Sequence, residues 1–216
     1  MKLFIWDFHG VLEKGNRDAV LEITNLALEK NGFPSVLLAE DNNKWYGEKW
    51  FQYFEHLLPK ESHQVHLKVQ STCIEIQKER PDILDKHIKI NDYVSEVLEA
   101  ISQKHQQILI SNCHQEALYN FIFLTKINKY FGKNNTFSTN SHLLPRPLSK
   151  REIFTNYVKK SPKFDEFITI GDSPSDMEII EKEPGRRYLY SHPGQKFREC
   201  KSDFKIQDLR EILKEI

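Results

Sequence analysis

The sequence is poor in cysteine and has no long apolar run. Its three cysteines are widely spaced, and no Cys-x-x-Cys pair occurs. The odd number argues against a disulfide framework, and the lack of a Cys-x-x-Cys pair argues against a cysteine zinc site. Both features are typical of a protein in a reducing compartment. No apolar stretch approaches the ~20 residues that cross a bilayer, and the first apolar run is too short for a secretory signal. We therefore expect a cytoplasmic protein that does not enter a membrane.

An excess of charge of either sign is also missing. Lys plus Arg and Asp plus Glu each number 31, so the formal net charge is zero. Because nucleic-acid-binding proteins are usually basic, we expect no nucleic-acid partner. Internal repeats and low-complexity segments are absent as well. The 216 residues suffice for one large domain, or for a core with a smaller module, and leave monomer and homodimer equally open.

The first dozen residues carry the clearest structural signal. Residues 3–6 are an unbroken apolar run that ends at Asp7, and Gly10 follows. A short apolar run bounded by a turn residue predicts a strand buried on both faces, as in a parallel sheet covered by helices. Ligands of such sheets bind beyond the carboxyl ends of the strands. Asp7 is therefore either a nucleophile or metal ligand, or only a polar residue that ends the strand.

Further along, the chain alternates between short apolar runs and helical patterns. Strands are expected at 107–111, 136–139, 166–172 and 187–191, and helices near 94–101, 118–124, 151–158 and 206–216. Such alternation predicts parallel strands joined by right-handed crossovers. The sequence therefore predicts an α/β fold, with a Rossmann-like doubly wound parallel sheet as its core.

The segment between the first strand and this core lacks a strand pattern. Helical spacing recurs over 18–30, over an aromatic stretch at 40–58 that is broken at Gly47, and over 61–79. We therefore predict a discontinuous core domain of residues 1–14 and 88–216. Residues 15–87 would form an inserted, all-helical domain.

Reactive side chains follow several of the predicted strands. Asp7, Ser111 and Asp172 would lie at one edge of a parallel sheet. Lys150 begins a helix, where a cation is unfavourable against the helix dipole unless it faces an anion. Asp176 is open to two interpretations, since it can close a capping box or join the other carboxylates. Carboxylates that share a crevice suit Mg²⁺, and a lysine and a serine hydroxyl beside them would bind phosphate.

These pieces together resemble the haloacid dehalogenase-like hydrolase superfamily. The family's first motif reads Asp7-Phe-His-Gly-Val-Leu12 here, and its second, an apolar strand ending in Ser or Thr, reads Ile108-Leu-Ile-Ser111. The third is a lysine at a helix start, Lys150. The fourth is Gly171-Asp-Ser-Pro-Ser-Asp176. The resemblance implies that the helical insertion is a cap of the C1 type, whose aromatic face would close over the site.

The resemblance also implies roles for individual residues. Asp7 would attack phosphorus and form an aspartyl-phosphate that water then hydrolyses. Mg²⁺ would be bound by Asp7, by the backbone carbonyl of His9 and by Asp172, and Asp176 would orient the water molecules of the metal. The implied activity is Mg²⁺-dependent removal of phosphate from a small phosphorylated metabolite.

Three residues would bind the phosphate of that substrate. They are Ser111, Asn112 and Lys150. Arg146, which precedes a proline, is the alternative to Lys150 as the phosphate-binding cation.

His9 departs from the family pattern, which has a second aspartate at this position to protonate the leaving group. Histidine can transfer protons, but Mg²⁺ and Lys150 nearby would favour a neutral imidazole, a usable base and a poor acid. We therefore expect slow or altered phosphatase chemistry. The alternatives are that His9 only packs or lends its carbonyl, and that the chain is a catalytically impaired module that binds a phosphorylated ligand or a protein partner.

Two features of the insertion have their own alternatives. His63 and His66 are spaced for metal binding on one helix, but no third ligand is evident and an exposed helix face is favoured. Trp45, Trp50 and Phe54 could face a substrate, although such an aromatic stripe is more often core.

Overall fold

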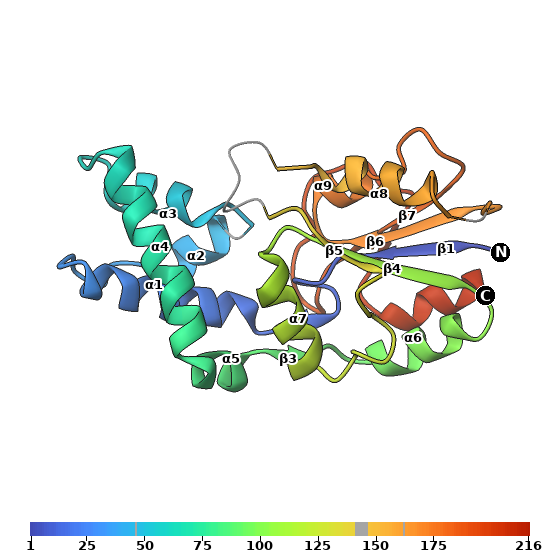
Figure 1. Ribbon diagram of the computed structural model, residues 1–216, viewed down its shortest axis with the longest axis horizontal. Helices are drawn as coiled ribbons and strands as arrows, with labels where there is room; N and C mark the ends of the chain where they lie inside the picture. The colour runs from blue at the N-terminus through green and yellow to red at the C-terminus, as the bar shows by residue number, and fades with distance from the viewer. Residues whose placement is uncertain (46, 141–146, 162) are drawn as a thin grey trace. The chain divides into compact units, whose positions relative to one another are not determined.

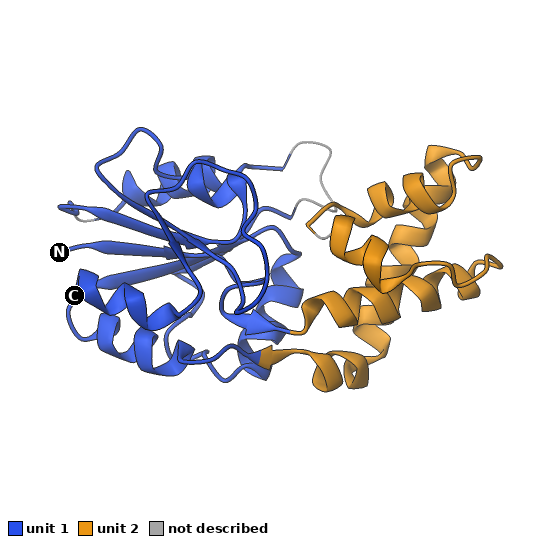
Figure 2. Ribbon diagram, turned by 180° about the vertical axis from the view of Figure 1, so that it is seen from behind, with its two compact units in different colours: residues 1–14, 90–216 blue, residues 15–89 orange. Residues whose placement is uncertain are grey.

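The computed structural model describes residues 1–45, 47–140, 147–161 and 163–216, which form two compact units. Met1–Lys14 and Ile90–Ile216 form the first unit, and Gly15–Lys89 form the second (Figure 2). The chain thus passes between the units at 14/15 and 89/90, where the sequence suggested 14/15 and 87/88. Two short strands next to these points, β2 (Glu13–Lys14) and β3 (Lys89–Ile90), form a two-stranded sheet.

The first unit is built on a six-stranded sheet in which all neighbouring strands are parallel. Its order is β5-β4-β1-β6-β7-β8. The strands are β1 (Leu3–Trp6), β4 (Gln106–Ser111), β5 (Thr136–Ser138), β6 (Phe167–Gly171), β7 (Gly185–Tyr190) and β8 (Phe204–Ile206). From β1 the chain builds outward on one side through β4 and β5, and then on the other through β6, β7 and β8. The order therefore reverses at β1, where ligand sites of such sheets lie.

Helices cover both faces of this sheet, as a parallel sheet requires. Figure 1 shows α6 (Val94–Ser102) and the C-terminal 3₁₀ helix η1 (Leu209–Glu215) on one face, and α8 (Lys150–Val158) and α9 (Pro174–Met177) on the other. A further helix, α7 (Gln115–Leu124), follows β4. The first unit is therefore an α/β Rossmann-like doubly wound parallel sheet, which confirms the predicted fold class.

Apolar side chains from both sheet faces fix the central strands. On one face, Ile5 and Ile110 belong to a buried cluster with Ile153 and Phe154 of α8. Each fully buried side chain of this size contributes about 1.5–3 kcal/mol relative to exposure. On the other face, the buried Trp6 indole donates a hydrogen bond of 3.0 Å to the Gln107 side chain. This bond links the end of β1 to the start of β4.

The second unit is helical. Its helices are α1 (Asn16–Lys30), α2 (Ala39–Trp45), α3 (Trp50–Leu57), α4 (His63–Glu79) and α5 (Pro81–His87). Trp50 and Phe54 are buried, and the Trp50 indole donates to Thr24 Oγ1 at 3.2 Å. Both residues are therefore core residues, as the more conservative interpretation of the stripe predicted. α4 ends at Glu79, as the helical spacing over 61–79 predicted, and Pro81 is the first residue of α5, a position that proline tolerates well.

The C-terminal segment differs from its prediction. Instead of one helix over 206–216, Phe204–Ile206 pair with β7 as an edge strand, and η1 follows. The turn between them is made by Asp208, whose side chain accepts a hydrogen bond from the backbone N–H of Arg210 at 2.9 Å. Among the helices of the described residues, none combines the length and apolar character needed to span a bilayer.

Candidate active site

Asp7 follows the last residue of β1, at the carboxyl edge of the sheet. Its backbone N–H donates to the carbonyl of Ile170 at 2.9 Å, so the pairing of β1 with β6 extends to this residue. Only 7 % of Asp7 is exposed. The strand therefore holds a buried carboxylate at the point where the strand order reverses.

Lys150 lies at the first position of α8 and faces two anions. Ser149 caps the helix, and the Glu152 side chain accepts from the backbone N–H of Ser149 at 2.8 Å. The Lys150 ammonium is buried and donates to Oδ1 of Asp7 at 2.7 Å and to Oδ1 of Asp176 at 2.6 Å. Burial acts to lower the pKa of Lys150, but the two carboxylates outweigh it and raise that pKa. These anions offset the unfavourable helix dipole.

Asp176 serves both roles that the sequence left open. Its Oδ2 accepts from the backbone N–H of Ser173 at 3.0 Å and from the Ser173 hydroxyl at 2.6 Å, which caps α9. Its Oδ1 accepts from Lys150. Gly171 makes this approach possible, because a Cβ there would lie 2.1 Å from the Cβ of Asp176. Helix capping therefore positions Asp176 for its contact with Lys150.

Three carboxylates, those of Asp7, Asp172 and Asp176, come close together. Each offers an oxygen, and these oxygens all lie within 4.8 Å of one another. Burial, followed by the negative charge of Asp176, raises the pKa of Asp7 to about 7, although Lys150 acts in the opposite direction. Lys150 and Arg198 together bring two positive charges to these three carboxylates, so among the described residues one negative charge is left without a cation. A hard dication with oxygen ligands fits this donor set.

Asp172 has two further neighbours. Gly10 adopts φ +78°, and a Cβ at this position would lie 2.7 Å from Oδ2 of Asp172. Glycine is therefore needed both for the turn after β1 and for the close approach of Asp172. The guanidinium of Arg198 lies 3.4 Å from the same oxygen, and sequence analysis did not identify this residue. No local pattern around Arg198 indicated the contact.

Ser111 ends β4 and is 1 % exposed. Its hydroxyl has no hydrogen-bond partner among the described residues, although an unsatisfied buried polar group is costly. An anion that accepts this proton would remove the cost. The next residue, Asn112, accepts from the Thr139 hydroxyl at 3.2 Å through its side-chain oxygen. Arg146, the alternative cation, lies outside the described residues.

His9 belongs to a different set of contacts. Its Nδ1 lies 3.2 Å from Oε1 of Glu13, and its ring packs edge-on against Phe121 of α7 with 4.9 Å between centroids. Burial lowers the pKa of His9, but hydrogen bonds with Cys113 and Glu13 outweigh it and raise that pKa to about 10. Cys113 and Glu13, which the expectation of a neutral imidazole did not include, both favour the protonated ring.

Glu13 was not among the candidate site residues predicted from the sequence. It is fully buried, and the same oxygen that faces His9 accepts a hydrogen bond of 3.0 Å from the backbone N–H of Gly10. Its spacing from His9, four residues, was the one signal in the sequence. Glu13 thus connects the turn after β1 to the imidazole.

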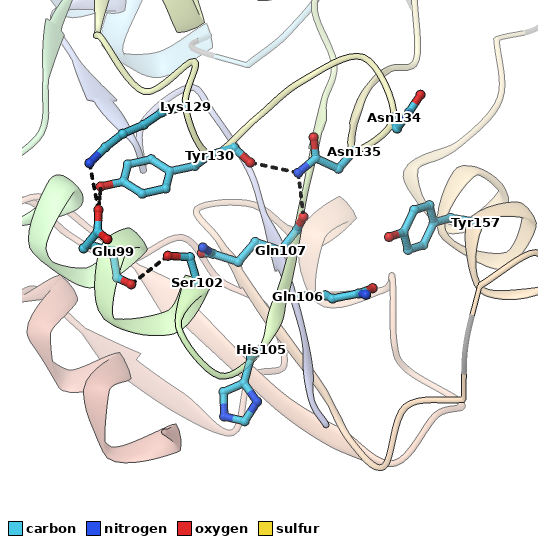
Figure 3. A pocket seen from close by; sticks show the side chains of 10 residues that line it. All are labelled: Glu99, Ser102, His105, Gln106, Gln107, Lys129, Tyr130, Asn134, Asn135 and Tyr157. Carbon is cyan, nitrogen blue, oxygen red and sulfur yellow. Dashed lines mark hydrogen bonds and ion pairs between the residues drawn. The ribbon is translucent and has the colours of Figure 1, made fainter.

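A separate cavity lies at the other end of the sheet. Its volume is about 480 Å³, and Gln106 and Gln107 at the start of β4 line it together with Glu99 and Lys129 (Figure 3). Lys129 donates to Glu99 at 2.7 Å, so their charges are already paired. This cavity is at the amino end of β4, whereas Ser111 is at the carboxyl end.

Comparison with known proteins identifies the family of this chain. The family model of the haloacid dehalogenase-like hydrolases matches residues 4–182, and the chain belongs to this family. None of the curated proteins compared with the sequence is a significant match.

Solved structures with similar folds cover nearly the whole chain. One described as a predicted phosphoglycolate phosphatase from Haemophilus somnus has a TM-score of 0.78 at 17 % identity, covering 99 % of this chain and 97 % of its own. A haloacid dehalogenase-like hydrolase family protein from Streptococcus pneumoniae has a TM-score of 0.75 at 13 % identity, with the same coverage. One described as a predicted phosphatase from Clostridium acetobutylicum reaches 0.74 at 14 % identity, again covering 99 % and 97 %.

Proposed function

We propose that this protein is a Mg²⁺-dependent phosphatase that removes phosphate from a small phosphorylated metabolite through an aspartyl-phosphate on Asp7. The observation that carries the proposal is the contact of one buried lysine with two carboxylates of a three-carboxylate cluster. Family membership and the fold shared with proteins described as phosphatases support it.

The proposed metal site consists of Asp7, Asp172 and the backbone carbonyl of His9, with Asp176 orienting metal-bound water. The close approach of the three carboxylates supports this assignment, because Lys150 and Arg198 bring only two positive charges to three negative ones. A bound Mg²⁺ would neutralise the carboxylates and polarise the substrate phosphate.

The reaction on Asp7 requires the other oxygen of its carboxylate to attack phosphorus, with the alcohol of the substrate leaving. Lys150 already holds Oδ1, so it fixes the carboxylate and offsets charge on the transferring phosphoryl group. The hydroxyl of Ser111, which has no hydrogen-bond partner among the described residues, would donate to a phosphate oxygen, and Asn112 would assist. Water then attacks the aspartyl-phosphate and releases inorganic phosphate, restoring Asp7.

His9 is proposed as the group that transfers protons to and from the reacting oxygens. Hydrogen bonds with Cys113 and Glu13 favour the imidazolium, which can protonate the departing alcohol. The neutral ring that remains can then accept a proton from the attacking water. Glu13 is a positioning residue in this scheme, because it holds the ring and the turn at Gly10.

The remaining parts of the proposal concern the setting of the reaction. Residues 15–87 would act as a cap that excludes water, and the protein would work in the cytoplasm without nucleic-acid or membrane partners. Trp50 and Phe54 are buried, so neither belongs to the aromatic face of the cap that would meet the substrate. Monomer and homodimer remain equally compatible with the scheme.

The proposal is tested by phosphate release from p-nitrophenyl phosphate, followed by a panel of phosphorylated metabolites. We expect turnover with Mg²⁺, none with a chelator, and none for Asp7→Asn. Asp82→Asn, an exposed aspartate of the second unit, is the matched control and should keep full activity. Activity that survives Asp7→Asn would refute the proposed nucleophile.

The second candidate is a module that binds a phosphorylated ligand or a protein without turnover. It is favoured by the position of the His9 ring, which is engaged by Glu13 and Phe121 as a packed side chain would be. Comparing wild type with His9→Asp over the same panel separates the two. Binding of phosphorylated ligands by an inactive wild type, with turnover appearing in His9→Asp, would support the module.

A further inference from the structure

A second cluster of metal-ligating side chains lies within the helical unit, 15–89. Glu55 of α3 and His63 and His66 of α4 each offer a ligand atom, and these atoms all lie within 4.8 Å of one another. Nδ1 of His63 lies 3.6 Å from Oε1 of Glu55. The sequence suggested the histidine pair but no third ligand. The fold supplies that ligand, because α3 and α4 pack against each other after a short connection.

His66 supplies an independent sign of a ligand site. It is 5 % exposed, and its Nε2 lies 2.9 Å from the backbone carbonyl of Leu58. Because a carbonyl only accepts, Nε2 carries the proton and the lone pair of the ring is left on Nδ1. Nδ1 is buried and has no hydrogen-bond partner among the described residues. Burial of an unsatisfied acceptor is costly unless something binds it.

This arrangement is the one that metal-binding histidines adopt. Such residues usually donate the second ring N–H to a carbonyl or carboxylate, which fixes the tautomer and orients the free nitrogen. The connection between α3 and α4 provides this carbonyl, at Leu58. The prediction that both histidines lie on an exposed helix face is therefore wrong for His66, which is buried. It is correct for His63, whose side chain is 60 % exposed.

We propose that Glu55, His63 and His66 bind a Zn²⁺-like dication that joins the end of α3 to the start of α4. Two imidazoles and one carboxylate suit zinc and its neighbours in the first transition row better than Mg²⁺, which prefers an all-oxygen site. The side chains of Glu55 and His63 are 47 % and 60 % exposed, so water can complete the coordination. The negative charge of Glu55 offsets the positive end of α4.

Metal binding is measured on the full chain after metal removal, by titrating ZnCl₂ against a chromophoric chelator in excess Mg²⁺. We expect Glu55→Gln and His63→Gln to weaken this zinc site by at least tenfold, since loss of even an outer-shell partner costs 10–100-fold. Both side chains are largely exposed, so these variants should fold. The matched control is His56→Gln, an exposed histidine of α3 that pairs with Glu48 and should bind zinc like wild type.

A second measurement separates this site from the carboxylates at Asp7, which could also take zinc. Zinc bound at Asp7 would still bind after the substitutions at Glu55 and His63. Only the bound zinc that is lost in these variants therefore belongs to the site between α3 and α4. Zinc should raise the melting temperature of wild type and His56→Gln more than that of His63→Gln. Equal affinity and equal thermal shifts in wild type, Glu55→Gln and His63→Gln would overturn the proposal. Neither readout depends on hydrolysis, so the result is independent of the proposed function.

Discussion

Nζ of Lys150 lies 2.7 Å from Oδ1 of Asp7, although 143 residues separate them in the sequence. The ammonium also holds Asp176 at 2.6 Å, and all three side chains are buried. The contact ties the start of α8 to the end of β1. Lys150 is therefore the residue whose removal should disturb both the stability and the chemistry of the carboxylate cluster.

Lys150→Met should destabilise the metal-free protein by about 3–5 kcal/mol, because it leaves buried carboxylates without their cation. If the proposed function holds, phosphate release should also fall by about 10²–10³-fold, as expected when one donor to transition-state charge is lost. Denaturant unfolding and initial rates measure the two effects. Arg151→Met, the next residue and partly exposed, is the control that should leave activity unchanged. A Lys150 variant with wild-type turnover would contradict the assigned role.

Gly10→Ala tests the close approach of Asp172. Alanine at φ +78° costs about 1 kcal/mol in backbone strain, and its Cβ would also push against the Asp172 carboxylate. We expect Mg²⁺ affinity, followed by calorimetry, to fall by about tenfold or more. Gly32→Ala is a matched control, since Gly32 has φ +81° and no atom within 4 Å of an added Cβ. A similar backbone cost in both variants, with a further loss of stability and weaker Mg²⁺ binding only in Gly10→Ala, is the expected pattern.

Much of this site follows from local features of the sequence. The apolar runs at 3–6 and 107–111 are strands because their residues are buried on both faces, and parallel pairing then brings Asp7 and Ser111 to one edge. Lys150 was expected to face an anion from its position in the helix alone, and it contacts two. Short-range physics and one rule of topology account for these features.

Other features depend on contacts that no local pattern encodes. Glu13 is buried because the turn after β1 aims the backbone N–H of Gly10 and the ring of His9 at its carboxylate. Arg198 reaches Asp172 from the irregular segment after β7. At the C-terminus, pairing with β7 makes Ile206 part of an edge strand, and the predicted helix is shortened to the 3₁₀ helix η1. In each case a tertiary partner, absent from the local sequence, decides the structure.

Ser111→Ala should lower phosphatase activity while leaving the fold intact. The hydroxyl has no hydrogen-bond partner among the described residues. Its loss should therefore leave the free energy of unfolding unchanged or raise it by up to about 1 kcal/mol. A lost hydrogen bond to a charged phosphate should reduce kcat/KM by about 10–100-fold. Thr136→Val removes a second buried, unpartnered hydroxyl, from the neighbouring strand β5, and should leave kcat/KM unchanged. Equal activity in both variants would show that Ser111 does not contact the substrate.

Glu215 should make the stability of the first unit depend on pH. It is 2 % exposed and accepts hydrogen bonds from Lys2 at 3.1 Å and from Tyr188 and Arg186. Burial alone would raise the pKa of Glu215, but these three partners together outweigh it and lower that pKa below its usual value. The unfolded chain thus binds this proton more readily than the folded one. The stabilisation is therefore complete above the unfolded pKa of ~4.3 and is lost as the pH falls through the folded value.

Glu215→Gln removes this charge and should cost about 2 kcal/mol at pH 7, the scale of hydrogen bonds to a charged group. Urea unfolding of wild type and variant at a series of pH values measures the difference. The difference in free energy of unfolding should be constant above about pH 5 and should shrink below about pH 4. Glu215 of the wild type is then protonated and loses the charge that the variant already lacks. Glu211→Gln, an exposed glutamate of the same 3₁₀ helix, should show little change at any pH. A gap that persists undiminished at pH 3 would mean that Glu215 stabilises the fold by packing and not through its charge.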